Sequence, residues 1–238
     1  FASLSVGAIN DITSKAFGTS SIMIGDTTTG TISAANYNVG LGVDVFAALT
    51  TGDNNVAVGF GALDANTTAS VNTAVGSNAL GANISGQQNV AVGANSLDAN
   101  TTGGDNVAVG TGALGANTTA ASNTAVGHLA LTANTTGTGH AALGQSALAA
   151  NTTGTNNTGL GQVSLTANTT GASNVAVGRA ALTANTTGDN NTAVGMNAMV
   201  ANTTGTDNVA VGAASLDANT TGAENTAVGK SSLTGNTT

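Results

Sequence analysis

The amino-acid sequence predicts an all-β fold, a parallel β-solenoid whose turns of 17 residues stack into an elongated rod. The first observation is a phrase that starts at Asn55 and recurs every 17 residues, without insertion or deletion, up to Thr238. The second is the composition: charged residues make up 6% and aromatic residues 2%, with no Trp, Pro or Cys, so a core of large side chains is not expected. The third is the regular spacing of Val and Leu, which argues against a disordered low-complexity chain.

The chain divides into two segments according to how well it keeps the phrase. Residues 38–238 form the 17-residue repeat array, because a degenerate copy of the phrase at 38–54 is in phase with the phrase that starts at Asn55. Residues 1–37 hold degenerate turns, and the stretch 22–25 (Ile-Met-Ile-Gly) lies one turn earlier in the same phase. Terminal repeats that depart from the consensus usually cap a solenoid. We therefore expect residues 1–37 to be a cap or a subunit-contact segment. The candidate subunit contacts are Phe1, Phe17, Tyr37 and Phe46.

Each phrase, numbered 1 to 17 from its first residue, predicts two short strands separated by turns. The first strand covers positions 2–4, and the second centres on position 9. Because side chains alternate across a strand, we expect positions 4 and 9 to face each other inside the coil, with the Ala of position 11 beside them. Position 2 is then a half-buried edge, and the Ala of position 3 forms an outward stripe suited to subunit contact. The predicted core residues are Val58, Val75, Val92, Val109, Val126, Leu63, Leu80, Leu97, Leu114 and Leu131.

Position 5 is glycine in every phrase, which indicates that no side chain is tolerated there. Either the backbone takes a positive φ at the strand end, or another backbone approaches too closely for a Cβ. The glycines of this column are Gly59, Gly76, Gly93, Gly110, Gly127, Gly144, Gly161, Gly178, Gly195, Gly212 and Gly229.

The turn sequence is Ala-Asn-Thr-Thr-Gly, as at 133–137, and it consists of typical turn residues. Identical residues on successive turns lie about 4.8 Å apart, so Asn and Thr can hydrogen-bond into ladders along the rod. Such a ladder explains Asn at positions 1 and 12 better than the formal Asn-Thr-Thr glycosylation signal does. His140 replaces one Asn of position 1 and is expected to be a polar stand-in at a turn, while His128 is expected to face solvent. The Asn ladder includes Asn66, Asn83, Asn100, Asn117 and Asn134.

The phrases Asn-Thr-Ala-Val-Gly and Asn-Val-Ala-Val-Gly resemble the head repeats of trimeric autotransporter adhesins. The longer unit, completed by Ala-Leu and Asn-Thr-Thr-Gly, resembles repeat arrays in bacterial and phage tail-fibre-like proteins. The resemblance covers about residues 38–238, and the unit here is longer than that of the adhesin heads. It implies a left-handed parallel β-roll, commonly three chains around one axis, that is exported to a surface and used as an adhesin or fibre shaft.

The sequence offers no pattern that catalysis, a cofactor or a metal requires, so we predict no catalytic, cofactor-binding or metal-binding residues and no enzyme activity. The acidic residues fall at variable columns, whereas calcium-binding β-rolls need an Asp in every unit. With a net charge of −8 and only three basic residues, Lys15, Arg179 and Lys230, nucleic acid is excluded as a partner. No apolar run of about 18 residues is present, so membrane insertion is not expected.

The sequence thus predicts a structural protein that is extracellular or at the cell surface and forms an adhesin shaft or a fibre. A fibre of a phage virion is one such location. The expected partner is the chain itself, either as a homotrimer or as an end-to-end filament in which residues 1–37 meet the turn near Asn236 of the next copy. The start at Phe1 rather than Met is expected of a processed or excised product. The alternative is a surface-binding module with a cell-surface or glycan ligand. Phe60 is its one aromatic candidate within the array. Ice binding through the Thr columns is less favoured, because adjacent Thr residues do not form two coplanar rows.

Overall fold

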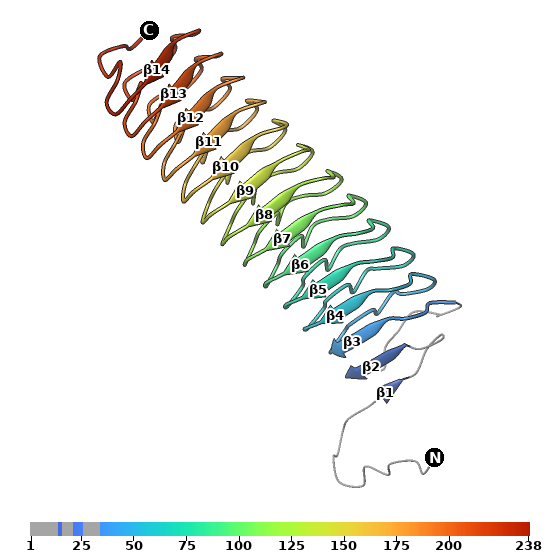
Figure 1. Ribbon diagram of the computed structural model, residues 1–238. Coiled ribbons are helices and arrows are strands. Elements are labelled where there is room, and N and C mark those ends of the chain that lie inside the picture. The colour runs from blue at the N-terminus through green and yellow to red at the C-terminus, as the bar shows by residue number, and fades with distance from the viewer. Residues whose placement is uncertain (1–13, 16–20, 26–33) are drawn as a thin grey trace.

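The computed structural model describes residues 14–15, 21–25 and 34–238, and the regular structure of these residues is entirely β. One sheet contains every strand in chain order, as Figure 1 shows. The first strand, β1, pairs antiparallel with β2, and the strands from β2 to β14 pair in parallel. The strands are β1 (Ser14–Lys15), β2 (Ile22–Gly25), β3 (Val39–Gly42), β4 (Val56–Val58), β5 (Thr73–Val75), β6 (Val90–Val92), β7 (Val107–Val109), β8 (Thr124–Val126), β9 (Ala141–Leu143), β10 (Thr158–Leu160), β11 (Val175–Val177), β12 (Thr192–Val194), β13 (Val209–Val211) and β14 (Thr226–Val228).

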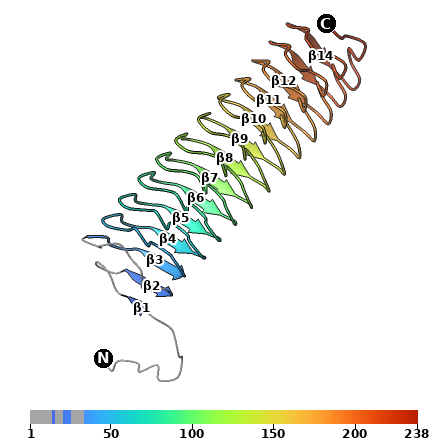
Figure 2. The ribbon, with the colours of Figure 1, turned by 180° about the vertical axis from the view of Figure 1, so that it is seen from behind.

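The parallel strands stack with a constant register of one repeat, which confirms the predicted β-solenoid. Val107 of β7 pairs with Thr124 of β8, 17 residues further along the chain. The degenerate stretch at the N-terminus keeps the same phase, because Ile22 of β2 pairs with Val39 of β3. Both views of the ribbon show a straight stack of similar coils (Figures 1 and 2). At about 4.8 Å per step, the stack from β2 to β14 is roughly 58 Å long.

Each turn holds one strand, and the second predicted strand around position 9 is instead a series of turns. In the turn 106–122, positions 7 and 9 are Gly112 and Leu114, and both have left-handed φ angles, of 66° and 52°. The N–H of Gly112 donates to Ala94 in the preceding turn, whereas the N–H of Leu114 donates to Ala130 in the following turn. The left-handed residues bend the chain at every second position. The segment therefore bonds to both neighbouring turns without becoming an extended strand.

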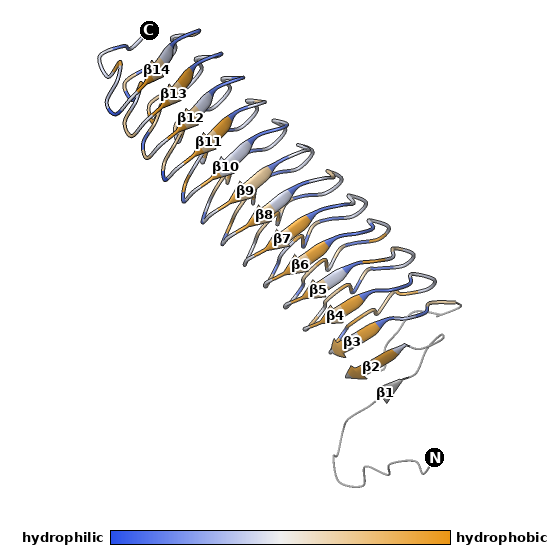
Figure 3. Cartoon of the chain, in the orientation of Figure 1, coloured by the Kyte–Doolittle hydropathy of each residue, from blue (hydrophilic) through white to orange (hydrophobic). Residues whose placement is uncertain are grey.

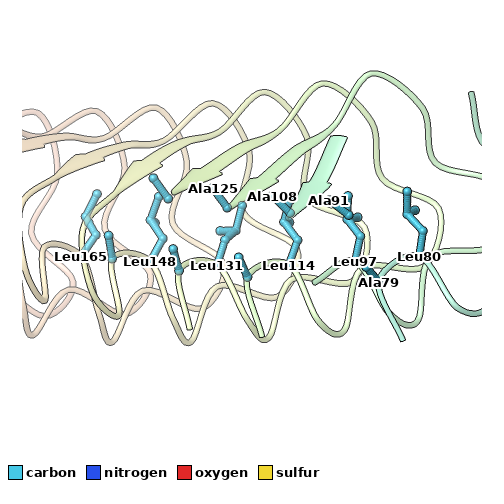
Figure 4. Close-up of a cluster of buried hydrophobic side chains, with 14 of the residues drawn as sticks. Ala79, Leu80, Ala91, Leu97, Ala108, Leu114, Ala125, Leu131, Leu148 and Leu165 are labelled. Carbon is cyan, nitrogen blue, oxygen red and sulfur yellow. The ribbon is translucent and has the colours of Figure 1, made fainter. Parts of the chain in front are cut away.

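The interior of the coil is lined by alanine and leucine, and the prediction that the Val of position 4 faces inward is wrong. Ala108 at position 3 is fully buried, as are Ala113 and Leu114 at positions 8 and 9. Figure 4 shows the leucines in a row along the rod, pointing toward the strands that carry the alanines. The Leu half of the predicted core is confirmed, since Leu63, Leu80, Leu97, Leu114 and Leu131 are all buried. The Val half faces outward and is partly exposed: Val58, Val75, Val92, Val109 and Val126.

Lack of space inside the coil explains why the small residue points inward. At position 159, where Gly replaces the usual Ala, a Cβ would lie 3.0 Å from Oγ of Ser164 and 3.4 Å from Cγ of Leu148. From residue 38 onward, a side chain larger than Ala therefore does not fit between the strand and the opposite wall. In the turn 38–54 the wall residue is the larger Phe46, and the strand residue opposite it is reduced to Gly40.

Three further expectations are overturned. The alanines of this column do not form an outward stripe, because they line the core. The Ala of position 11 is half-buried rather than part of the core, as at Ala116. Phe46 is not a subunit contact but a fully buried core residue, because it occupies position 9, the column that holds Leu or, at Met199, Met elsewhere in the array. Tyr37 is 56% exposed, and Phe1 and Phe17 lie outside the described residues.

Candidate functional site

The glycine column combines both features that the sequence offered as alternatives. Gly127 has a φ of +138°, and a Cβ built on it would lie 2.5 Å from the carbonyl oxygen of Gly144 in the next turn. Gly229 at the end of the array has a φ of +118° but no heavy atom within 4 Å of the added Cβ. The unusual backbone conformation therefore belongs to the turn itself, whereas the close approach comes from the turn that follows.

The Asn of position 1 supplies a hydrogen-bond acceptor at the place where the backbone ladder changes direction. The N–H of Asp105 donates to the preceding turn, and the N–H of Val107 donates to the following one. Between them, the N–H of Asn106 donates to Oδ1 of Asn89 at 3.0 Å, and the Asn106 side-chain amide donates to the same oxygen at 3.2 Å. The Asn side chain thus replaces a carbonyl. This is why a fully buried polar residue recurs in this column.

The Asn of position 12 forms a second buried column, which confirms the predicted ladder. Asn117 donates to Oδ1 of Asn100 at 3.0 Å, and Asn134 donates to Oδ1 of Asn117 at 3.1 Å. The two Asn columns meet at position 15, because the carbonyl of Ala120 accepts from Asn106 at 2.9 Å and from Asn117 at 3.1 Å. Buried polar groups are tolerated when their bonds are complete, as they are along most of this column.

The position-12 ladder is incomplete where it begins. Oδ1 of Asn66 is buried and has no hydrogen-bond partner among the described residues. Asn83 in the next turn donates to the carbonyl of Gly86 instead. In the turn before Asn66, position 12 is the buried apolar residue Leu49, so the polar column starts at Asn66.

His140 stands in for Asn in the position-1 column, as expected, and it is buried. Its N–H donates to Oδ1 of Asn123 at 3.1 Å, and its Nδ1 accepts the N–H of Asn157 at 3.2 Å. Since Nδ1 is an acceptor, the proton lies on Nε2, which donates to the carbonyl of Gly154 at 2.8 Å. Burial lowers the pKa of His140, and the bond to the Gly154 carbonyl partly opposes that shift. His128, at position 6, is exposed as predicted.

The two Thr residues of each turn have different surroundings. Thr135 at position 13 is half-buried, and its hydroxyl donates to the carbonyl of Thr152 in the next turn at 3.1 Å. Thr136 at position 14 is exposed. The adjacent Thr residues therefore do not form two coplanar outward rows, in agreement with the low weight given to ice binding.

The outer surface of the strands is an uncharged face that runs the length of the rod, and we call it the strand face. It consists of positions 2 and 4 of the parallel strands, which hold only Val, Ile, Leu, Thr and Ala. Figure 3 shows these strands as hydrophobic, with paler strands where position 2 is Thr. Its more exposed members are Ile22 (49%), Val39 (43%), Leu41 (49%), Val75 (36%), Val92 (37%), Leu143 (50%), Val211 (37%) and Val228 (70%).

The remaining polar groups form no cluster with recognisable chemistry. The described ranges contain no pocket and no group of three or more His, Cys, Asp or Glu residues placed to hold a metal ion. Burial raises the pKa of Asp64, and the carboxylate of Asp44 in the preceding turn raises it further. Burial also raises the pKa of Asp98. Phe60, the aromatic candidate of the array, is 55% exposed at position 6 beside the strand face.

The fold and these columns define a repeat protein of the β-solenoid class. Within the described residues, no helix has the length and apolar character of a membrane span. Comparison of the chain with protein-family models, with curated proteins and with solved structures gave no match. The columns and the strand face are therefore the features on which a functional proposal rests.

Proposed function

We propose that this protein is a structural rod that self-associates through its strand face into a homo-oligomeric fibre or adhesin shaft outside the cell. The observation that carries the proposal is the strand face itself, an apolar and uncharged surface along the whole stack from β2 to β14. Continuous apolar surface of this kind on a soluble protein marks a site of association.

The size of the strand face reaches the lower bound for a specific contact. Strands of three residues stacked from β2 to β14 cover roughly 10 Å by 58 Å. Two such faces together bury roughly 1,100 Å², which is above the lower bound of about 1,000 Å² for a specific interface. The side chains are short and β-branched, so they lose little rotamer freedom when they become buried.

The spacing of the strand face favours a second copy of the same chain as the partner. Its side chains recur once per turn, at about 4.8 Å, and another rod of the same repeat presents ridges and grooves of the same spacing. The distribution of charged side chains also favours the strand face as the contact surface. The net charge is −8, and the acidic side chains lie outside positions 2–4, so like-charge repulsion opposes contact through the other surfaces.

The polar columns suit the chain for a mechanical role. Backbone ladders connect each turn to the next along the rod, and two buried Asn columns reinforce most of these steps. In such an array each unit is stabilised by its neighbours, so the body is stiff along its length. A shaft that holds a binding tip at a distance from a surface needs this property, and the resemblance to adhesin heads and tail fibres points to the same use.

The test is the mass of the purified protein in solution, measured by light scattering after size-exclusion chromatography. We expect the wild type to be an oligomer, and we expect Val92→Lys combined with Val126→Lys to give folded monomers. The matched control places the same charges on the exposed position 14, as Thr102→Lys with Thr136→Lys, and should remain oligomeric. A wild type that is monomeric at every concentration contradicts self-association.

Electron cryomicroscopy distinguishes the modes of assembly. Cross-sections with two or three coils whose strands face one another support the strand-face contact, and three coils around one axis correspond to the homotrimer. Filaments that are one coil wide would indicate end-to-end association instead. They would contradict association through the strand face.

A further inference from the structure

We propose that His140 is a pH-sensitive weak point of the rod, at which protonation of the imidazole opens the contact between the turn 140–156 and the turn 157–173. The proposal rests on the hydrogen bonds of one residue in the position-1 column. It does not depend on self-association, because every contact involved lies within one chain.

The contact across His140 depends in this column on one long hydrogen bond, even when the imidazole is neutral. At most Asn steps, such as Asn174 on Asn157, one Oδ1 accepts both the backbone N–H at 2.9 Å and the side-chain amide at 3.2 Å. At other steps, such as Asn123 on Asn106, the Oδ1 accepts the backbone N–H alone, at the shorter distance of 3.0 Å. At the step from His140 to Asn157, the only bond of this kind is the one from the Asn157 N–H to Nδ1, at 3.2 Å. The Asn157 side-chain amide donates to the carbonyl of Gly171, just as the Asn174 amide donates to the carbonyl of Gly188.

Protonation removes this remaining bond. A charged imidazole carries a proton on both ring nitrogens, so Nδ1 becomes a donor that faces the N–H of Asn157. Nε2 keeps its bond to Gly154, and the Asn151 amide, 3.1 Å from Nε2, is a further donor group. A buried N–H without an acceptor and a buried charge are both unfavourable, so acid favours a state in which the two turns separate at this point.

No neighbouring group can compensate the charge. The groups that hydrogen-bond to the ring come from the turns 140–156 and 157–173, and they are the Gly154 carbonyl, the Asn151 amide and the backbone N–H of Asn157. Between Asp105 and Arg179, the only titratable side chains in the sequence are His128 and His140. His128 lies at the exposed position 6, in the column that follows the strand end. No carboxylate is therefore available to stabilise the imidazolium.

The direction of the pH dependence follows from burial. Burial lowers the pKa of the closed form, while an opened turn exposes the ring to water and returns it toward its ordinary value near 6.5. The open form thus binds the proton more tightly. The contact is fully stable above the ordinary value and weakens as the pH falls below it. Because each turn of such an array contacts only its neighbours, weakening this contact uncouples residues 38–156 from residues 157–238.

Hydrogen exchange of the full-length chain tests the proposal. The variant His140→Asn restores the residue found at position 1 in the other phrases, so it keeps the fold, and His128→Asn is the control for a solvent-facing imidazole. Exchange is compared between variants at equal pH, at about pH 8 and at about pH 5, a range in which histidine titrates and most carboxylates do not.

We expect the amides of Ala141 and Asn157, which bond across this contact, to exchange several-fold faster in the wild type than in His140→Asn at the lower pH. The two proteins should differ less at the higher pH. The amides that bond between β4 and β5 should exchange at the same rate in all variants. His128→Asn should show the same exchange rates as the wild type at both pH values. A ratio between wild type and His140→Asn that does not change with pH overturns the proposal, and so does loss of the acid effect in His128→Asn.

Discussion

Adding a single methyl group to the glycine column separates the two reasons for glycine at position 5. Gly127→Ala places a Cβ 2.5 Å from the carbonyl oxygen and 2.6 Å from the carbonyl carbon of Gly144, whereas Gly229→Ala places it in open space. Both residues have a φ angle that L-residues rarely adopt, so both substitutions carry the same kind of backbone cost. The two variants differ in the steric contact with the next turn.

The structure gives the size of the expected difference. The backbone cost is about 1–3 kcal/mol for either variant. In Gly127→Ala the next turn must also move by roughly 1 Å to restore normal contact distances. That movement lengthens the ladder bonds that Gly144 donates to Val126 at 2.8 Å and Ser146 donates to His128 at 3.0 Å, each worth about 1 kcal/mol. We therefore expect roughly 3–5 kcal/mol of destabilisation for Gly127→Ala and only the backbone cost for Gly229→Ala.

The assay is urea unfolding followed by circular dichroism, with His128→Ala as a neighbouring substitution that should change the free energy of unfolding by less than about 0.5 kcal/mol. Gly127→Val should be more severe than Gly127→Ala and should prevent the array from assembling. Because the last turn can open separately, amide exchange at β14 must accompany the measurement on Gly229→Ala. Equal destabilisation of both alanine variants, checked in this way, would refute the role of the close approach.

Three other predictions follow from the columns. Ala108→Val should cost about 1–3 kcal/mol in unfolding free energy by overfilling the core, whereas Val107→Thr on the strand face should be nearly neutral; the opposite order would contradict the orientation of β7. Asn117→Leu should lower the free energy of unfolding by about 2–4 kcal/mol, measured by thermal unfolding, because the Asn134 amide and Oδ1 of Asn100 lose their buried partners. An unchanged stability would show that the ladder does not stabilise the fold. Asp98→Asn should raise the melting temperature slightly near neutral pH. Burial raises the pKa of Asp98, so the folded state gains stability as the pH falls through that raised value, and the advantage of Asn should shrink in acid.

The constant period made the stack predictable. Thr124 lies 17 residues after Val107 and pairs with it, and the same spacing places each Gly of position 5 over the next. The degenerate stretch at β2 was also found from its phase alone. A fixed period without insertions leaves only one in-register arrangement in which every apolar residue falls over its equivalent. The fold class and the ladders followed from this arrangement.

The strand face could not be predicted by the alternation rule alone. Alternation requires positions 2 and 4 to share one side of the strand and position 3 to take the other, but it does not say which side is the interior. Hydrophobicity favoured Val over Ala for the core, and that choice was wrong. One sign in the sequence pointed the other way: position 2 accepts both Val and Thr, as at Val107 and Thr124, while position 3 holds only Ala or Gly from residue 38 onward. A position that accepts the hydroxyl of Thr is expected to be exposed, whereas a position that accepts only the smallest side chains is expected to lie in a narrow interior.

The sequence by itself determined the repeat length, the parallel stack, the glycine column and the buried ladder of Asn100, Asn117 and Asn134. Only the tertiary structure decided which side of each strand is covered, that the segment around position 9 is turned rather than extended, and that His140 is buried beside Asn157. The reason is that these features depend on the width of the coil and on the left-handed bends at positions 7 and 9. Both are set by how one whole turn closes on itself against its neighbours, whereas the period is a property of the chain alone.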